Sequence, residues 1–153
     1  MSKLRVAVIG TGMIANSAHF PALNILRKEG LVDVVGVADI RGEVAEETAK
    51  RHSVANWYTD PQKMLDELKP DFVAVCTPNV YHKKWTIAAL KAGAHVACEK
   101  PMATSLADAK EMWQTAKDCG KMLFPCQCMR WRNYMQQSKE LVDSGELGDV
   151  CFS

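Results

Sequence analysis

Residues 4–15, LRVAVIGTGMIA, contain the pattern that most directly predicts the fold of this 153-residue chain. Its first six residues are mostly apolar and β-branched, and they predict a strand that ends at Gly10. The G-x-G-x-x-A pattern that follows predicts a tight turn into a helix over residues 13–28. Pro21 lies inside that helix, so we expect a kink or break near it. A strand that passes through a glycine-rich turn into a helix is the opening unit of a parallel α/β sheet.

Short apolar runs and helical patterns alternate along the rest of the chain. The predicted strands cover residues 4–9, 32–38, 55–58, 72–76, 95–98 and 122–126, and a further strand begins within 149–153. The predicted helices cover residues 13–28, 43–51, 61–68, 81–92, 106–120 and 131–144. Asp60 and Ser105 are the predicted N-caps of two of these helices. The alternation requires crossover connections and indicates an α/β fold, a doubly wound parallel sheet with helices on both faces.

The glycine-rich turn also predicts a phosphate site. Gly10 permits the tight turn, Gly12 lets the backbone approach a pyrophosphate, and Ala15 lets the helix lie close to the strand. Unpaired N–H groups at the helix N-terminus then face the phosphates. Sheets of this kind bind ligands beyond the carboxyl ends of their strands, and the turn lies at the first of these ends. The cofactor-binding residues predicted here are Gly10, Thr11, Gly12, Met13 and Ile14.

Asp39 follows the second strand, where a dinucleotide fold places a carboxylate against the adenosine ribose hydroxyls. Its negative charge would repel the 2′-phosphate of NADP, which favours NAD as the cofactor. Arg41 lies two residues further on and could pair with that phosphate or stack on adenine. NADP therefore stays open as the alternative cofactor. For each of the two side chains, a solvated charge at a turn is the alternative role.

Two polar clusters follow later strands at the same edge of the predicted sheet. Thr77-Pro78-Asn79-Val80-Tyr81-His82 follows the fourth strand, and Glu99-Lys100-Pro101 follows the fifth. In a partly apolar cleft beside a cofactor, Lys100 could donate a hydrogen bond to a substrate oxygen and help to move its proton. Spacing alone leaves two simpler roles open: a solvated charge for Lys100, and packing or helix capping for His82.

Residues 71–102 carry a resemblance to a known family. They contain T-P-N-x-x-H at 77–82 and A-G-x-H-V-x-x-E-K-P at 92–101. This pairing closely resembles the Gfo/Idh/MocA oxidoreductases, which include glucose–fructose oxidoreductase, inositol dehydrogenases and many sugar dehydrogenases. The resemblance extends over the whole chain. It implies an NAD(P)-dependent dehydrogenase that transfers a hydride between nicotinamide and a hydroxyl-bearing carbon of a sugar, cyclitol or related polyol.

The same resemblance implies roles for the two polar clusters. Glu99 and Lys100 would approach the nicotinamide ribose and the substrate, with Lys100 as the catalytic lysine. The Lys100–Pro101 peptide bond is often cis in this family. The residues that would line the central part of the cofactor are Thr77, Pro78, Asn79 and His82.

The chain departs from the family in length. Family members are roughly twice as long, and their second domain supplies most substrate contacts, an acid/base partner and the usual oligomer interface. We therefore expect a Rossmann domain in residues 1–125, followed in 126–153 by a linker helix and the first strand of a truncated C-terminal domain. The chain would be either a fragment or a natural short form that binds cofactor without turnover. We expect the intact protein to be an active homo-oligomer and the chain alone to be inactive.

Two other functions fit the same fold. A non-enzymatic dinucleotide sensor or regulator is the main alternative, because fold does not fix function. The Glu99-Lys100-Pro101 segment favours the enzyme, since a sensor needs no lysine that handles protons. A methyltransferase that uses S-adenosylmethionine fits poorly, because its glycine loop usually has a third glycine where this chain has Ile14.

The composition of the chain excludes some classes of binding partner and favours one cellular compartment. The 19 basic and 18 acidic residues give a net charge of +1, which argues against nucleic acid or an anionic membrane surface as a partner. No apolar run is long enough for a transmembrane helix, and no signal-peptide pattern is present, so we expect a cytoplasmic protein. The six cysteines lack zinc-ligand spacing, and we expect no metal site. Cys76 and Cys98, which end apolar runs, are predicted to be buried small hydrophobic residues.

Overall fold

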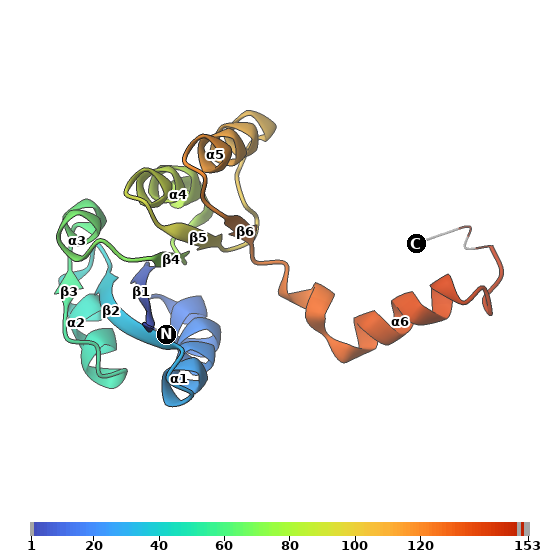
Figure 1. The fold of residues 1–153 in the computed structure, drawn as a ribbon, viewed down its shortest axis with the longest axis horizontal. Coiled ribbons are helices and arrows are strands. Elements are labelled where there is room, and N and C mark those ends of the chain that lie inside the picture. Colours follow the sequence, from blue (N-terminus) through green and yellow to red (C-terminus); the bar gives the residue numbers. More distant parts are fainter. Residues whose placement is uncertain (1, 150, 152–153) are drawn as a thin grey trace.

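The predicted strands form one parallel sheet in the order β3-β2-β1-β4-β5-β6 (Figure 1). The computed structural model describes residues 2–149 and 151. The strands are β1 Leu4–Ile9, β2 Val32–Ala38, β3 Trp57–Tyr58, β4 Phe72–Val75, β5 His95–Cys98 and β6 Leu123–Pro125. β1 lies next to β2 and β4, so the chain moves outward from β1 first in one direction and then in the other. This strand order confirms the doubly wound parallel sheet.

The register of the strands brings their carboxyl ends together. Ile9 at the end of β1 pairs with Ala38 of β2 and Val75 of β4. Cys98 at the end of β5 pairs in turn with Val75 and with Pro125 of β6. The residues that follow these strands therefore lie along one edge of the sheet, where α/β folds bind their ligands.

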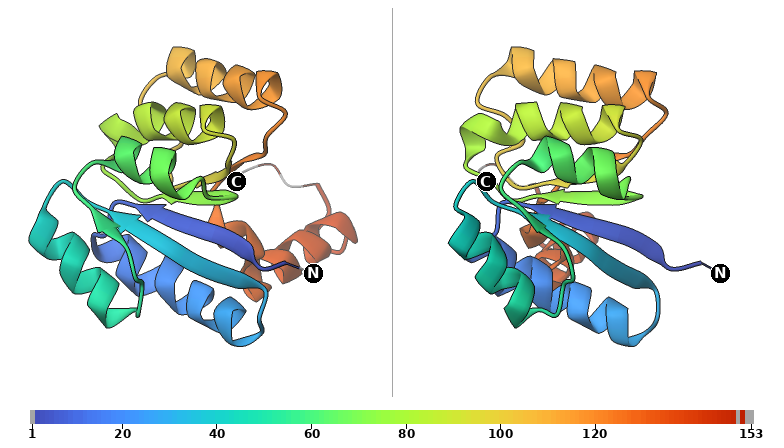
Figure 2. Two further views of the ribbon diagram at one scale, coloured as in Figure 1. Left: turned by 60° about the vertical axis from the view of Figure 1, so that its left-hand side comes forward. Right: turned by 90° about the vertical axis from the view of Figure 1, so that its left-hand side faces the viewer.

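Helices cover both faces of the sheet. The helical segments are η1 Ala15–His19, α1 Phe20–Lys28, α2 Gly42–Arg51, α3 Pro61–Leu68, η2 Asn79–Tyr81, α4 His82–Lys91, α5 Leu106–Asp118, η3 Cys128–Trp131 and α6 Asn133–Asp143. α1 and α2 cover one face, while α3, α4 and α5 cover the other (Figure 2). The predicted N-caps are confirmed, because Asp60 accepts a hydrogen bond from the Gln62 N–H at 2.8 Å and Ser105 accepts one from the Asp108 N–H at 3.1 Å.

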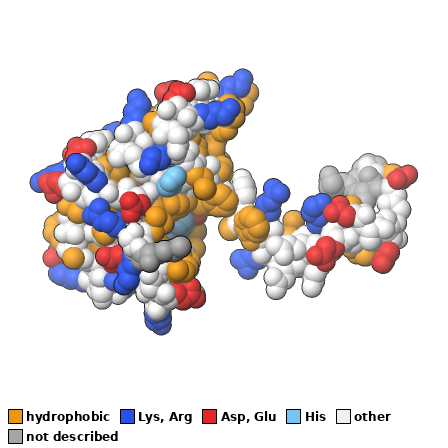
Figure 3. Space-filling model, in the orientation of Figure 1, with side chains coloured by type: hydrophobic (Ala, Val, Ile, Leu, Met, Phe, Trp, Pro, Cys, Tyr) orange, Lys and Arg blue, Asp and Glu red, His pale blue; other side chains and the backbone are white. Residues whose placement is uncertain are grey.

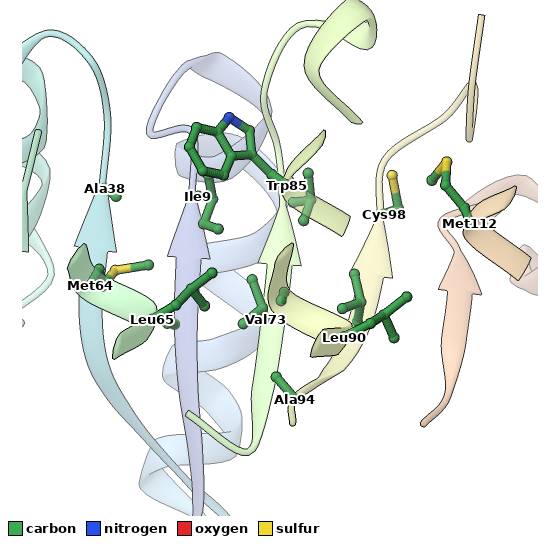
Figure 4. Packing of buried hydrophobic residues seen from close by; sticks show 14 of the residues in the cluster. Ile9, Ala38, Met64, Leu65, Val73, Trp85, Leu90, Ala94, Cys98 and Met112 are labelled. Carbon is green, nitrogen blue, oxygen red and sulfur yellow. The ribbon is translucent and has the colours of Figure 1, made fainter. Parts of the chain in front are cut away.

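Alternate residues of the strands enter two separate cores, as the period-2 geometry of a strand requires. Ala7 and Ile9 of β1 point into the larger core, between the sheet and helices α3–α5. Val8 points into the smaller core with Ala15 and Phe20. Labelled members of the larger core come from strands and helices far apart in the sequence (Figure 4). They are Ile9, Ala38, Met64, Leu65, Val73, Trp85, Leu90, Ala94, Cys98 and Met112.

The irregularity expected near Pro21 takes the form of a π-helical turn. Over Ala15–His19 the helix opens by one residue, and the Phe20 N–H donates to the Ala15 carbonyl five residues earlier. Pro21, which has no N–H to donate, then lies in the first turn of the regular helix α1. π-turns of this kind often mark functional sites, and this one turns His19 toward the sheet edge.

Two of the predicted strands, 55–58 and 122–126, are longer than the observed strands β3 and β6. β3 has two residues and β6 has three, because each lies at an edge of the sheet and pairs on one side only. The predicted strand within 149–153 falls largely on residues 150, 152 and 153, which lie outside the described residues, and the described residues 149 and 151 are not in a strand.

After β6 the chain leaves the sheet, and α6 extends away from it (Figures 1 and 3). Every described residue from 127 onward is exposed. The space-filling view shows this segment as a separate lobe with apolar side chains on its surface. No helix among the described residues has the length and apolarity that a membrane crossing requires.

Candidate functional site

A cavity of about 490 Å³ opens at the carboxyl edge of the sheet. It lies beside β1, at the point where the strand order reverses. Segments from four strand-to-helix connections surround it, which is the expected place for a ligand in a doubly wound sheet. The lining residues are Ile9, Gly10, Gly12, Ala38, Asp39, Ile40, Arg41, Pro61, Cys76, Thr77, Pro78, Tyr81, Lys84 and Trp85.

The glycine-rich turn forms the floor of this cavity, and its two glycines meet different constraints. Gly10 has φ +87°, and a Cβ there would lie 2.7 Å from the Cys76 carbonyl carbon and the Thr77 nitrogen. A side chain at Gly10 is therefore excluded by both conformation and contact. A Cβ on Gly12 would meet nothing within 4 Å, so the backbone borders open space. Ala15 is fully buried, as close packing of the helix on the strand requires.

Asp39 is buried and accepts four hydrogen bonds. Its Oδ2 accepts from the Thr11 N–H at 3.0 Å and the Thr11 hydroxyl at 3.2 Å. Its Oδ1 accepts from the Arg41 N–H at 3.0 Å and from Nε of the same residue at 3.2 Å. Burial acts to raise the pKa of Asp39, but the hydrogen bonds from Arg41 and Thr11 and the Arg41 charge outweigh it and lower that pKa below its usual value. The site therefore presents a fixed negative charge beside the glycine turn.

Thr77 and His82 connect the β4 end to the β5 end. The fully buried ring of His82 has Nε2 2.8 Å from the Thr77 carbonyl oxygen and Nδ1 2.8 Å from the Pro101 carbonyl oxygen. It thus holds together the two loops that carry the polar clusters. The Thr77 hydroxyl is buried and has no hydrogen-bond partner within the part of the chain that the structure describes. Other atoms of Thr77 line the cavity.

Glu99 follows β5 and is held by hydrogen bonds at both carboxylate oxygens. Its Oε1 lies 2.9 Å from Nε2 of His19, and its Oε2 accepts from the Lys100 N–H at 3.1 Å. The Lys100–Pro101 peptide bond is cis, as the resemblance implied. Lys100 is exposed, and its ammonium group forms no ion pair with the described residues. The Lys100 side chain is therefore exposed and without an ionic partner among the described residues at this end of the sheet.

Three thiols lie near the Glu99 carboxylate. Burial, followed by the negative charge of Glu99, raises the pKa of Cys126 to about 12. Burial likewise raises the pKa of Cys98 to about 11 and that of Cys76 well above its usual value. Cys76 and Cys98 are buried and unpaired, which confirms the prediction that they act as small hydrophobic residues. The cluster of His19, Glu99 and Cys126 brings its candidate metal-ligand atoms within 4.8 Å of one another.

The structure brings most of the predicted site residues to one edge of the sheet. Gly10, Gly12, Asp39, Arg41, Thr77 and Pro78 line the cavity. Met13 is exposed, Ile14 packs against the smaller core, and Asn79 begins the short helix η2. Thr11, His82, Glu99 and Lys100 also lie outside the cavity lining. For all of the predicted residues, a contact with the cofactor stays a prediction.

Sequence reasoning missed one wall of the cavity and one polar partner. Ile40, Pro61, Tyr81, Lys84 and Trp85 complete the lining. Trp85 lies within the helix predicted over residues 81–92; it packs on the larger core and also borders the cavity. The polar partner is His19, whose Nε2 lies 2.9 Å from Oε1 of Glu99. It belongs to neither polar cluster of the sequence, and its place four residues after Ala15 of the glycine pattern is a local signal for it.

Residues 4–126 match the model of the oxidoreductase family with an NAD-binding Rossmann fold. The chain belongs to the Gfo/Idh/MocA family. It is 40% identical over 149 residues to a D-glucoside 3-dehydrogenase of Escherichia coli, covering 97% of this chain and 42% of that enzyme. It is 30% identical over 145 residues to a myo-inositol 2-dehydrogenase of Thermotoga maritima, covering 95% of this chain and 42% of that protein.

A solved structure confirms the fold of this family member. The WlbA dehydrogenase of Chromobacterium violaceum, in complex with NADH and UDP-GlcNAcA, superimposes with a TM-score of 0.89 at 30% identity, covering 97% of this chain and 42% of that one. The chain thus spans less than half the length of the relatives it matches.

Proposed function

We propose that this chain is the cofactor-binding half of an NAD(P)-dependent dehydrogenase that acts on a sugar, cyclitol or related polyol. The observation that carries the proposal is the cavity at the glycine turn, which Asp39 and Thr77 border. Glu99 and Lys100 do not line it but follow β5 at the same edge of the sheet. The relatives' names, a glucoside and an inositol dehydrogenase, support the substrate class. In the intact protein, hydride would pass between the substrate carbon and nicotinamide.

The residues present fit a dinucleotide. Open space beside Gly12 leaves room for a pyrophosphate, and the helix that follows directs its free N–H groups there. Thr77 and Asp39 line the same cavity. Ile40, Tyr81 and Trp85 supply apolar walls of the kind that an adenine or a nicotinamide ring requires. The cofactor supplies the hydride acceptor, and the protein supplies its position.

Lys100 is the proposed catalytic residue. Its ammonium would donate a hydrogen bond to the reacting hydroxyl or carbonyl oxygen and help to move the proton of that oxygen. Lys100→Met keeps the apolar stem and removes the charge. In the intact enzyme we expect this change to lower kcat by about 10²–10⁴-fold, with little change in the affinity for NAD. Near wild-type kcat would assign Lys100 a surface role and favour the dinucleotide sensor.

NAD is the proposed cofactor, and NADP is the alternative. The ionised Asp39 carboxylate would repel a 2′-phosphate, whereas ribose hydroxyls could replace one of its present donors, Thr11 or Arg41. Calorimetry with NADH and NADPH measures the preference. Asp39→Ser should weaken binding of NADH and improve that of NADPH. A wild-type chain that binds NADPH about tenfold more tightly, a difference of about 1.4 kcal/mol, would show that Arg41 decides the preference.

The domain arrangement is also a proposal. Residues 1–125 would form the Rossmann domain, and 126–153 the linker helix and first strand of a C-terminal substrate domain. Exposure of every described residue after 126 supports a further domain that covers this segment. That domain would also supply the homo-oligomer interface of a cytoplasmic enzyme, which light scattering of the longer protein measures.

Calorimetric titration of the chain with NADH tests the cofactor site directly. We expect the wild-type chain to bind NADH and to show no turnover in a screen of sugars and inositols. Gly12→Val places a side chain in the pyrophosphate space, and we expect it to weaken binding by about 100-fold or more without loss of the folded structure. Wild-type chain that fails to bind either dinucleotide would refute the proposed function.

A further inference from the structure

His19, the last residue of the π-turn η1, lies next to Glu99 at the carboxyl edge of the sheet. The two residues are 80 positions apart in the sequence. His19 has its Nε2 2.9 Å from Oε1 of Glu99, which follows β5. Its side chain is 16% exposed and that of Glu99 is 11% exposed. The contact between them is therefore largely shielded from water, where a hydrogen bond to a charged group is stronger than at the surface.

The direction of this hydrogen bond follows from the chemistry of its partners. A carboxylate only accepts, so Nε2 of His19 donates to Oε1 of Glu99 at 2.9 Å. The other oxygen of the same carboxylate accepts the backbone N–H of Lys100 at 3.1 Å. His19 thus restrains Glu99, and Glu99 restrains the backbone from which the Lys100 side chain departs.

We propose that His19 is a positioning residue that sets the direction of Lys100 through the Glu99 carboxylate. The proposal rests on the proposed function of Lys100. His82 holds the other side of the same segment through the Pro101 carbonyl. Lys100 itself has no ion pair among the described residues to fix it, so its direction depends on these two anchors of its backbone.

The neighbouring Cys126 suggests metal binding as a competing use of His19 and Glu99. The observations favour positioning over metal binding. Both oxygens of Glu99 already accept hydrogen bonds. These two hydrogen bonds link His19 through Glu99 to the backbone of Lys100, and positioning therefore explains the arrangement better than a metal site does.

His52, the residue that follows α2, offers a matched control because it packs against η1 and α1. Its ring stacks on Phe20 with centroids 4.0 Å apart, and its Nε2 lies 3.0 Å from Oδ1 of Asn16. His52→Ala therefore removes a comparable histidine contact from η1 and α1 without touching Glu99. His19→Gln keeps an N–H donor near the position of Nε2, so it should preserve the contact that His19→Ala removes.

The first test measures amide hydrogen exchange at Lys100 in this chain, after circular dichroism has confirmed folding. We expect His19→Ala to speed exchange of the Lys100 amide hydrogen about tenfold, which is the change that loss of one ordinary hydrogen bond produces. His52→Ala should change it much less, and His19→Gln should restore the slow rate. Equal effects of His19→Ala and His52→Ala, or no effect of His19→Ala, would overturn the proposal. A stoichiometric Zn²⁺ complex lost in both His19→Ala and Cys126→Ala would overturn it in favour of a metal site.

The second test uses kinetics of the longer enzyme. His19→Ala should lower kcat about tenfold or more, with the KM for NAD unchanged, and His19→Gln should recover most of the loss. In a Lys100→Met background the same change should have no further effect, because both act through one group. Additive losses would overturn the positioning role. NADH binding by the wild-type chain is scored separately, so failure of the proposed function and failure of this inference are distinguishable.

Discussion

Residues 2–125 and residues 126–149 contain helices of similar amphipathic character but in different surroundings. Each of α1–α5 buries at least one residue against the sheet, whereas α6 buries none. Tyr134, Met135, Leu141 and Val142 are each between 41% and 51% exposed. The spacing of these four places them on one stripe of the helix. An apolar stripe therefore predicts that a helix forms. The helix contributes to the free energy of unfolding only where another surface of the protein packs against that stripe.

Contacts within α6 are local. The Lys139 ammonium and the Asp143 carboxylate, four residues apart, form an exposed ion pair, and the Ser138 hydroxyl donates to the Tyr134 carbonyl. Exposed pairs of this kind contribute only about 0.3–0.5 kcal/mol. An isolated helix of this length is marginal in water. We therefore expect the free energy of unfolding to depend almost wholly on the first region.

Leu90→Ala tests the contribution of the first region and should have the largest effect. Leu90 is fully buried on α4 in the larger core (Figure 4). Truncation of a buried leucine leaves a cavity and costs about 2–5 kcal/mol. Urea denaturation followed by circular dichroism measures the change. A loss below about 1 kcal/mol would mean that the α4 face is loosely packed, and the contrast with α6 would weaken.

Gly10→Ala and Gly145→Ala compare the same substitution in the two regions. Both glycines have positive φ, +87° and +76°, but a new Cβ clashes with backbone only at Gly10. We expect Gly10→Ala to lower the free energy of unfolding by about 1–3 kcal/mol, from the left-handed strain and the displaced end of β4. Gly145→Ala carries similar local strain in a segment that adds little to global stability. Equal losses in urea denaturation would show that the second region unfolds together with the first.

Ending the chain after Cys128 should have the smallest effect. The deletion removes α6 but leaves β6 and the hydrogen bond from the Cys126 N–H to the Cys98 carbonyl. The free energy of unfolding should change by less than about 0.5 kcal/mol, and NADH affinity should be unchanged. A loss several times larger, measured by the same urea titration, would mean that α6 supports the sheet in solution.

Local patterns were sufficient to predict the sheet and the glycine turn. β-branched runs that end at glycine or at a charged residue set β1 and β2, whose predicted and observed bounds agree. The need for a left-handed residue at Gly10 followed from the turn itself. These features depend on residues that are close together in the sequence, so they can be predicted from the sequence alone.

The missed features depend on residues that are distant in the sequence. The contact of His19 with Glu99 joins residues 80 apart, and it requires both a π-turn and the strand order of the sheet. The 3.6-residue period of an α-helix does not distinguish a single π-turn from the regular helix around it. The apolar wall of the cavity likewise combines Pro61 and Trp85 from different helices. Periodicity assigns such residues to a buried face without saying which of them also border a cavity.

The two edge strands of the sheet bear on how copies of this chain would associate. β3 has two residues and β6 has three, and Pro125 in β6 has no N–H to offer. Unpaired backbone at a long, flat edge is a template for strand addition and fibril growth, and short edges with proline suppress it. The short edge strands and Pro125 therefore disfavour aggregation through backbone hydrogen bonds at the sheet edges. At high concentration, self-association of the chain should instead proceed through the apolar side chains of α6 and should be reversible on dilution.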